Sequence, residues 1–200
     1  MEEDGLARLE GAPSIRKCVE ADLDKVLELE RISFKFPYDM DTLVRYVELG
    51  SAVFLVCEVR GNIIGYIISQ WQTGGTGSIV SIAVSPAHRN KGIGSILLDH
   101  AIAKMRDRIS VVELQVSVSN ADAVRFYQRR GFRVTRVLHS YYPDREAAFL
   151  MTLRLQSDCT STGTAVQCAR GLERRRDGAA LTLDRKLVRR SVGEHGQDRA

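Results

Sequence analysis

Apolar positions recur along residues 13–156 with two different spacings, and each spacing predicts one kind of secondary structure. Alternating or continuous runs of β-branched residues predict strands over 14–18, 52–59, 63–72, 78–85, 111–117, 132–138 and 147–155. Apolar residues three and four positions apart predict helices over 22–33, 39–49, 95–108 and 121–130. This order of strands and helices predicts an α/β domain with a mixed sheet.

The pattern fades at both ends of the chain. Residues 1–12 are acidic and polar, whereas residues 157–200 have almost no aromatic side chains and are rich in Ser, Thr, Gly and Arg. We therefore expect a flexible leader over 1–12, one domain over 13–156 and a disordered basic tail over 157–200. The tail carries nine basic and six acidic residues, and hence +3 of the chain's net charge of +4. A weak contact between this tail and ribosomal RNA is the one nucleic-acid interaction that the charge pattern raises.

Composition argues against several classes of protein. The four cysteines lie far apart and form no Cys-x-x-Cys pair, which argues against a zinc site or a disulfide framework and favours a reducing cytoplasm. The N-terminus is unlike a signal peptide, and no apolar run approaches the roughly 20 residues that a membrane span needs. We therefore expect a cytoplasmic protein with no bound metal and no membrane contact.

The stretch 79–100 gives the first chemical signal. A β-branched strand pattern leads into a basic loop with two glycines, HRNKGIG over 88–94, and a helical pattern begins at Ser95. A strand, a glycine loop and a helix in this order direct backbone N–H groups and a helix N-terminus at one point, which is an anion-binding arrangement. Arg89 and Lys91 add positive charge beside it.

Two nucleotide-binding patterns do not fit this loop. The Gly-x-x-x-x-Gly-Lys-Ser/Thr string of a P-loop is absent, and the third glycine of a dinucleotide fingerprint would fall at Leu97. The remaining pattern is Arg-x-x-Gly-x-Gly between a strand and a helix. It resembles the pyrophosphate loop of the GNAT superfamily, the GCN5-related N-acetyltransferases that bind acetyl-CoA.

The resemblance extends over roughly residues 13–156 and is carried by four stretches. They are SIAVSPAHRNKGIGSILL, LQVSVSNADAVRFYQRRGF, YYPDREAAFLM, and FPY at 36–38. Within the superfamily the chain resembles the RimI-type ribosomal-protein alanine N-acetyltransferases and the archaeal N-terminal acetyltransferases. The resemblance implies the GNAT fold, with a mixed sheet of six to seven strands that is splayed at the cofactor site and flanked by about four helices.

The same resemblance implies acetyl-CoA as co-substrate and assigns roles to particular residues. The backbone of Ile82, Ala83 and Val84 would pair with the pantetheine arm, and the Val84 N–H would polarise the thioester carbonyl. Asn120 would contact the cofactor where the sheet opens. Tyr127 would also contact the cofactor and would protonate the departing thiolate as general acid. The residues expected to hold the pyrophosphate are Arg89, Asn90, Lys91, Gly92, Ile93, Gly94 and Ser95.

Aromatic residues are the candidates for binding the acceptor. Tyr141 and Tyr142 precede the last strand in a loop that resembles that of N-terminal acetyltransferases, and Phe36 and Tyr38 would form the opposite wall of a peptide groove. Packing alone is the alternative explanation for these loop tyrosines, and helix capping is a second role for Asn120.

One position departs from the family pattern. RimI-type enzymes carry a glutamate as general base where this chain has Gln115, which has no proton affinity to offer. Some archaeal relatives carry a histidine on the strand before the glycine loop, where this chain has Ser78. Some relatives carry an acidic residue in the first loop, at a position that falls near Tyr38 in this chain. We therefore expect Gln115 and Ser78 to orient a water that carries the proton away. Other ionisable candidates, interpreted as surface or structural residues, are Glu30, Glu113 and His88.

The sequence thus predicts transfer of an acetyl group from acetyl-CoA to the α-amino group of protein N-termini, by direct attack in a ternary complex. No cysteine lies in the glycine loop or the fourth helix, which argues against an acyl-enzyme. The expected partners are N-terminal peptides, with ribosomal proteins among the candidates, and we expect a monomer or a weak complex. Two alternatives remain open: acetylation of lysine or a small amine, and a non-catalytic acyl-CoA-binding module, because Gln115 replaces the glutamate.

Overall fold

The computed structural model describes residues 11–155 of the 200-residue chain, and these form one mixed sheet with helices on both faces. The seven strands lie in the order β1-β2-β3-β4-β5-β7-β6. Their bounds are β1 Ser14–Lys17, β2 Ala52–Val59, β3 Asn62–Gln72, β4 Thr76–Val84, β5 Val111–Ser117, β6 Arg133–Leu138 and β7 Ala148–Arg154. The predicted leader lies almost entirely, and the predicted tail entirely, outside the described residues, so both remain predictions.

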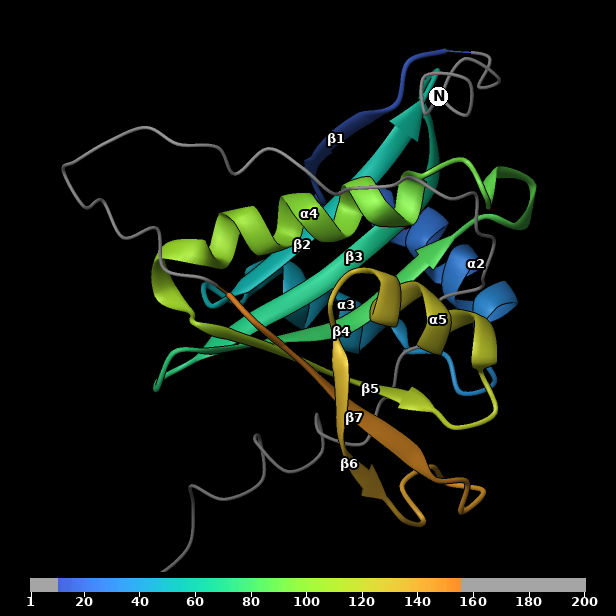
Figure 1. Cartoon of the computed structure of the whole chain (residues 1–200). Helices are drawn as coiled ribbons and strands as arrows, with labels where there is room; N and C mark the ends of the chain where they lie inside the picture. Colours follow the sequence, from blue (N-terminus) through green and yellow to red (C-terminus); the bar gives the residue numbers. More distant parts are fainter. Residues whose placement is uncertain (1–10, 156–200) are drawn as a thin grey trace, which may run out of the picture.

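Helices cover both faces of the sheet. Figure 1 shows α4 crossing one face of β2 and β3, whereas α2 and α3 lie on the opposite face. The helices are α2 Leu23–Ser33, α3 Met40–Glu48, α4 Ile93–Met105 and α5 Ala121–Arg129, with short 3-10 turns η1 Glu20–Asp22, η2 Pro86–His88 and η3 Arg106–Arg108. None of the helices within residues 11–155 is long and apolar enough to cross a membrane. The α/β class, the splayed mixed sheet and the four helices agree with the prediction.

Local sequence signals explain where the helices begin and end. Asp39 caps α3, since its Oδ1 accepts a hydrogen bond from the Thr42 N–H at 2.9 Å. Gly131 follows α5 with φ +86°, a left-handed backbone that glycine adopts without steric cost.

The start of β4 is a correction to the sequence prediction. The sequence pattern predicts a strand that begins at residue 78, but Thr76 and Gly77 also belong to the strand and pair with Gln72 and Trp71 of β3. A Cβ at Gly77 would lie 2.7 Å from the Ile109 side chain. Glycine at this position leaves room for the Ile109 side chain within a strand and does not form a turn.

Two hydrophobic cores lie on opposite faces of the sheet. One lies beneath α4 and α5 and includes Leu97, Met105 and Tyr127, all fully buried. The other lies beneath α2 and α3 and includes Leu43 and Tyr66. Burying a large apolar side chain contributes about 1.5–3 kcal/mol, so these cores hold the central strands rigidly as a frame for the site.

The sheet opens between β4 and β5. These parallel strands are in register only from Thr76↔Val111 to Ser78↔Glu113, although β4 continues to Val84 and β5 to Ser117. On its other edge β4 carries an extra residue, because Ser81 pairs with Ile68 while Ile79 pairs with Ser69. Such a bulge bends the strand and strengthens its twist, which accompanies the separation of β4 from β5.

Candidate active site

The backbone of β4 presents hydrogen-bonding groups to the gap between β4 and β5. The Ser85 N–H donates to the Ile64 carbonyl at 2.8 Å, which makes this a hydrogen-bonded pair of the β3–β4 ladder. Antiparallel strands exchange bonds at every second residue pair. The next hydrogen-bonded pair is therefore Ala83 with Tyr66 of β3. The residues on either side of Ala83 direct their N–H and C=O groups to the other edge of β4, so those of Ile82 and Val84 point into the gap. Of the three residues expected to pair with pantetheine, Ala83 contributes its backbone to β3 instead.

The loop between β4 and α4 has the backbone shape of an anion cradle. Asn90 and Gly92 adopt left-handed conformations, with φ +67° and +79°. Gly92 is the N-cap of α4, and its carbonyl accepts the first helical bond from the Ile96 N–H at 3.1 Å. The N–H groups of the first helical turn therefore have no partner within the helix and point out of its N-terminus.

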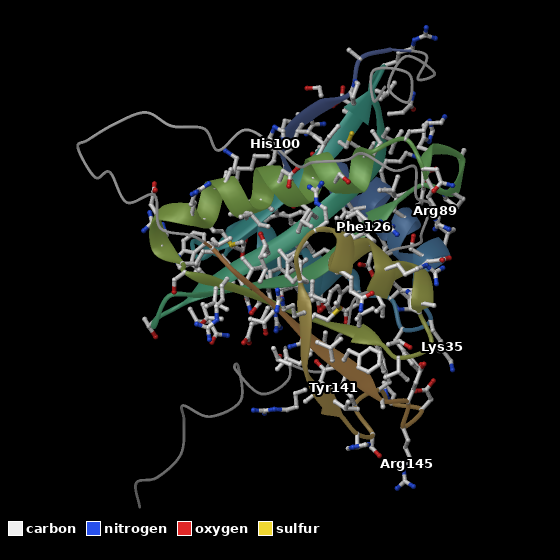
Figure 2. The ribbon with its side chains drawn as sticks, in the orientation of Figure 1. Lys35, Arg89, His100, Phe126, Tyr141 and Arg145 are labelled. Atoms are coloured by element: carbon white, nitrogen blue, oxygen red, sulfur yellow. The ribbon has the colours of Figure 1, made fainter. Side chains whose placement is uncertain are left out.

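Arg89 fixes this loop to the end of β4. Its Nε donates to the Val84 carbonyl at 3.1 Å, and burial lowers the pKa of the half-buried guanidinium below its usual value. An arginine remains charged despite such a shift. Figure 2 shows Arg89 on the loop that precedes α4. The positive charge therefore lies next to the strand end that borders the gap.

Tyr127 projects from α5 into the core beneath α4 and is fully buried. Its ring packs edge-on against Phe126 and Phe132, with centroids 5.1 and 5.5 Å away. Its hydroxyl has no hydrogen-bond partner within residues 11–155. Burial raises the pKa of Tyr127 well above its usual value, and the nearby Tyr142 raises it further. The phenol is therefore a neutral proton donor across the physiological pH range.

Gln115 approaches the gap from the opposite face. The even-numbered residues of β5 belong to the core beneath α4, and side chains alternate along a strand, so Gln115 and Ser117 point away from that core. Asn120 follows shortly afterwards and caps α5, because its Oδ1 accepts from the Ala123 N–H at 3.1 Å. The helix that carries Tyr127 therefore starts at the end of the strand that carries Gln115.

Two loops from distant parts of the chain lie next to each other beyond the gap. Lys35 of the α2–α3 loop forms an ion pair with Asp144 of the β6–β7 loop, with Nζ and Oδ2 2.5 Å apart. Figure 2 shows Lys35 and Arg145, the neighbour of Asp144, at the same end of the molecule. The four aromatic residues predicted to bind the acceptor belong to these loops: Phe36, Tyr38, Tyr141 and Tyr142.

These aromatic residues differ in exposure. Tyr38 is buried in the core beneath α2 and α3, where its ring lies 6.2 Å from that of Tyr46. Tyr142 is also buried and meets Tyr141 edge-on at 5.6 Å. Phe36 and Tyr141 are half-buried. The structure thus brings all four to the two adjoining loops, with Phe36 and Tyr141 more accessible than the other two.

A buried glutamate supports one of these loops. Glu30 of α2 is fully buried, and its Oε2 accepts from the Tyr38 N–H at 2.9 Å. Its Oε1 accepts from the hydroxyls of Tyr66 and Ser81, the latter at 3.0 Å. The sequence contains a signal for this network, because Glu30 lies four residues after Val26 on the apolar face of the helix. A charged residue in that position requires buried partners.

The residues considered for removing the proton from the amine include three that lie close together on β4 and β5. Ser78 is in register with Glu113, and Gln115 is two residues further along the strand, a distance of about 6.6 Å. All three side chains are half-buried. His88 lies apart from them in η2, where burial, and then Lys91, lower its pKa. No group of three or more His, Cys, Asp or Glu side chains that could hold a metal ion occurs within residues 11–155.

Comparison with known proteins agrees with this geometry. Residues 23–132 match the acetyltransferase (GNAT) family. An uncharacterized N-acetyltransferase of Methanocaldococcus jannaschii is 39% identical over 140 residues, which cover 68% of this chain and 88% of that protein. An N-alpha-acetyltransferase of Sulfurisphaera tokodaii is 32% identical over 154 residues, which cover 70% of this chain and 92% of that protein.

A solved structure extends the likeness to three dimensions. The ribosomal-protein-S18-alanine N-acetyltransferase of Escherichia coli superposes with a TM-score of 0.67 at 25% identity, covering 76% of this chain and 99% of that one. Binding of acetyl-CoA is typical of this fold. The chain therefore belongs to the GNAT acetyltransferase family, and it is related to the archaeal N-alpha-acetyltransferases and the RimI-type bS18 alanine acetyltransferases.

Proposed function

We propose that this protein transfers the acetyl group of acetyl-CoA to the α-amino group of protein N-termini, by direct attack in a ternary complex. The observation that carries the proposal is the ion pair between Lys35 and Asp144. It joins the two loops that would form the walls of the acceptor groove. We infer that loops held together in this way suit a chain end as acceptor better than an internal lysine.

The gap and the glycine loop fit acetyl-CoA. The backbone groups of Ile82 and Val84 that face the gap would bond the amides of the pantetheine arm, and the Val84 N–H would polarise the thioester carbonyl. The side-chain amide of Asn120 would contact the same arm. The pyrophosphate would be held by the left-handed turn and the first turn of α4, through Arg89, Asn90, Lys91, Gly92, Ile93, Gly94 and Ser95.

The chemistry requires two proton transfers and no covalent enzyme intermediate. The acceptor nitrogen forms a bond to the carbonyl carbon, the carbon–sulfur bond breaks, and Tyr127 gives its proton to the departing sulfur. Gln115 and Ser78 would hold the water that removes the proton from the amine. Phe36, Tyr38, Tyr141 and Tyr142 would line the path by which the acceptor enters.

Cysteine chemistry is a poor alternative. Cys18 directly follows β1 and Cys57 lies in β2, at the edge of the sheet away from the gap, and both are buried. Burial raises the pKa of Cys18 to about 12 and that of Cys57 to about 11. Neither thiol is then a thiolate at neutral pH, and the thiolate is the nucleophile. Within the described part of the chain, this supports direct attack over an acyl-enzyme.

The missing carboxylate at position 115 favours an α-amine as acceptor. An α-amino group has a pKa of about 8, so roughly a tenth of it is neutral and nucleophilic at pH 7. A lysine amine with a pKa of about 10.4 is neutral only about 0.04% of the time. An enzyme without a strong base therefore loses little with an N-terminal acceptor and some hundreds-fold with lysine.

The test is incubation with acetyl-CoA and a library of peptides that begin with Ser, Ala, Thr or Met, with mass spectrometry to locate the added acetyl group. Each peptide is paired with a copy whose N-terminus is blocked and which carries an internal lysine, and free small amines form a third set. We expect acetylation of the free N-termini alone. Turnover confined to lysine or small amines would refute the N-terminal specificity, and acetyl-CoA binding without any turnover would favour the binding module.

A further inference from the structure

Glu146 joins the loop that follows β6 to the turn between β5 and α5. The hydroxyl of Ser117 donates to Oε1 of Glu146, and the hydroxyls of Ser117 and Ser119 are 2.9 Å apart. The bond from Ser117, and then that from Ser119, lower the pKa of Glu146, so its carboxylate stays ionised at neutral pH. The proposed chemistry gives this carboxylate no role.

The main chain of the same residue holds the two loop tyrosines. The Glu146 carbonyl accepts hydrogen bonds from the N–H groups of Tyr141 and Tyr142, at 3.0 and 3.1 Å. A single residue therefore contacts the tyrosines through its backbone and the β5–α5 turn through its side chain. The main chain next to Glu146 meets the same turn, since the Val118 N–H donates to the Ala147 carbonyl at 3.1 Å, and the carboxylate adds a side-chain bond on the tyrosine side of that contact.

The loop needs such a tie because its backbone is strained. Ser140 and Arg145 have φ of +50° and +67°, and neither is glycine. L-residues adopt this left-handed region at a cost, which is tolerated where surrounding contacts impose it. The bonds made by Glu146 connect the loop that contains Ser140 and Arg145 to the β5–α5 turn. They are suited to hold the loop backbone in this left-handed conformation.

The turn on the other side of the bond belongs to the proposed active site. Ser117 lies two residues after Gln115 on the same face of β5, and Ser119 directly precedes Asn120, the cap of α5. Tyr142 is near enough to Tyr127 to affect its pKa. The Glu146 carboxylate is thus placed to hold the acceptor loop in a fixed relation to the helix that carries the proposed general acid.

We propose that Glu146 is a positioning residue for the acceptor, whose carboxylate fixes the Tyr141–Tyr142 loop against the start of α5 and so forms the acceptor-binding wall. This rests on the proposed function of the same site, since it takes the loop tyrosines as that wall. Glu146 does not contact acetyl-CoA and does not take the proton from the amine. Its loss weakens acceptor binding and leaves cofactor binding and the chemical step in place.

The experiment compares three variants of the full chain with the wild type. Glu146→Ala removes the carboxylate, and Glu146→Gln keeps a carbonyl oxygen that can accept from Ser117. Asp122→Asn is the matched control, because it removes the same charge from an exposed residue in the first turn of α5. The measurements are kcat and KM for the acceptor, the Kd for acetyl-CoA by calorimetry, and the amide exchange rates of Tyr141 and Tyr142.

We expect Glu146→Ala to raise the acceptor KM about tenfold, consistent with losing one hydrogen bond to a charged group, with kcat and the acetyl-CoA Kd within about twofold of wild type. The two tyrosine amides should exchange about tenfold faster. Glu146→Gln should recover most of both effects, and Asp122→Asn should show neither. An unchanged acetyl-CoA Kd shows that the Ala variant is folded.

The two proposals fail in different ways. Wild-type exchange rates at Tyr141 and Tyr142 in Glu146→Ala, or an unchanged acceptor KM, would overturn the role of Glu146 whichever amine is the acceptor. Absence of wild-type turnover on N-terminal peptides would overturn the proposed function instead, and the exchange rates would then decide whether Glu146 holds the loop.

Discussion

Two buried tyrosines differ in whether the hydroxyl is hydrogen-bonded, and this predicts opposite effects on stability when each hydroxyl is removed. Tyr66 and Tyr127 are both fully buried. The Tyr66 hydroxyl bonds to Glu30 and lies 2.9 Å from the hydroxyl of Ser81. The Tyr127 hydroxyl has no hydrogen-bond partner within the described residues. A buried hydroxyl without a partner costs about 1–3 kcal/mol of stability, so a structure retains it only if something else requires it.

The change to test is Tyr127→Phe, with Tyr66→Phe as its matched control. We expect Tyr127→Phe to leave the free energy of unfolding unchanged or to raise it by about 1 kcal/mol, because it removes an unsatisfied group. Tyr66→Phe should lower it by about 1.5–3 kcal/mol, because it removes a bond to a buried carboxylate. The ring contacts are kept in both variants, so packing should contribute little to either value.

The loss of activity should be large in Tyr127→Phe and small in Tyr66→Phe, the reverse of the order expected for the loss of stability. Positioned proton transfer typically contributes about 100- to 10,000-fold to the rate, equivalent to about 3–5 kcal/mol of barrier. We therefore expect Tyr127→Phe to lower kcat at least 100-fold, with the acetyl-CoA Kd retained, and Tyr66→Phe to retain most of kcat where it is folded. Urea unfolding followed by the fluorescence of Trp71 gives the stabilities, and release of CoA thiol gives the rates.

One pattern of results would refute this reasoning. If Tyr127→Phe lowered stability by more than 1 kcal/mol and left kcat within about fivefold of wild type, the hydroxyl would be a structural group. The raised pKa of Tyr127 adds an independent check. Because the folded protein holds this proton more tightly than the unfolded chain, kcat should show no fall that is due to Tyr127 below about pH 10.

Three further predictions follow from the structure. Gln115→Glu places a carboxylate where the family resemblance implies a base and should raise kcat/KM below about pH 8. A pH profile identical to wild type would show that position 115 is not where a base belongs. Gly92→Ala places a side chain at φ +79° in open space, so strain of about 1–2 kcal/mol should weaken acetyl-CoA binding about fivefold or more by calorimetry. Arg16 donates to both carboxylate oxygens of Asp22 and is the main cause of its lowered pKa. Because the folded state favours the ionised carboxylate, the bonds to Arg16 stabilise the fold above about pH 4, and this contribution is lost as pH falls through the folded pKa. Asp22→Asn should therefore be less stable than wild type in urea at pH 7, and the difference should shrink toward pH 2.

The backbone of the proposed cofactor loop could be predicted from the sequence because the signal is local. The strand, the loop over 88–94 and the start of the next helix are contiguous, and glycine spacing reports directly on backbone conformation. The left-handed backbone at Gly92 agrees with that pattern. The role of Ala83 could not be derived in this way, because the sequence does not say which of two alternating residues bonds to the neighbouring strand.

The contacts that join the two walls of the proposed acceptor groove could not be predicted, because they form between distant segments. Lys35 and Asp144 are 109 residues apart in the chain, and no local pattern pairs them. Glu30 carried a partial signal in its position on an apolar helix face, but its partners lie on two strands. The tie between Ser117 and Glu146 depends on how the last hairpin folds back along β5, which the sequence pattern does not specify.

The carboxylates around the proposed acceptor groove bear on how the amine loses its proton. Glu30 already accepts from two hydroxyls and a backbone N–H, and Glu146 accepts from Ser117 and has a lowered pKa. A carboxylate whose ionised form is stabilised by donors is a weaker base, so Glu146 does not replace the glutamate missing at position 115. Glu30 has no exposed surface through which to reach an amine. Both residues are better suited to holding the two loops than to taking a proton, which supports the proposed transfer to water and would make the pKa of the acceptor amine a determinant of the rate.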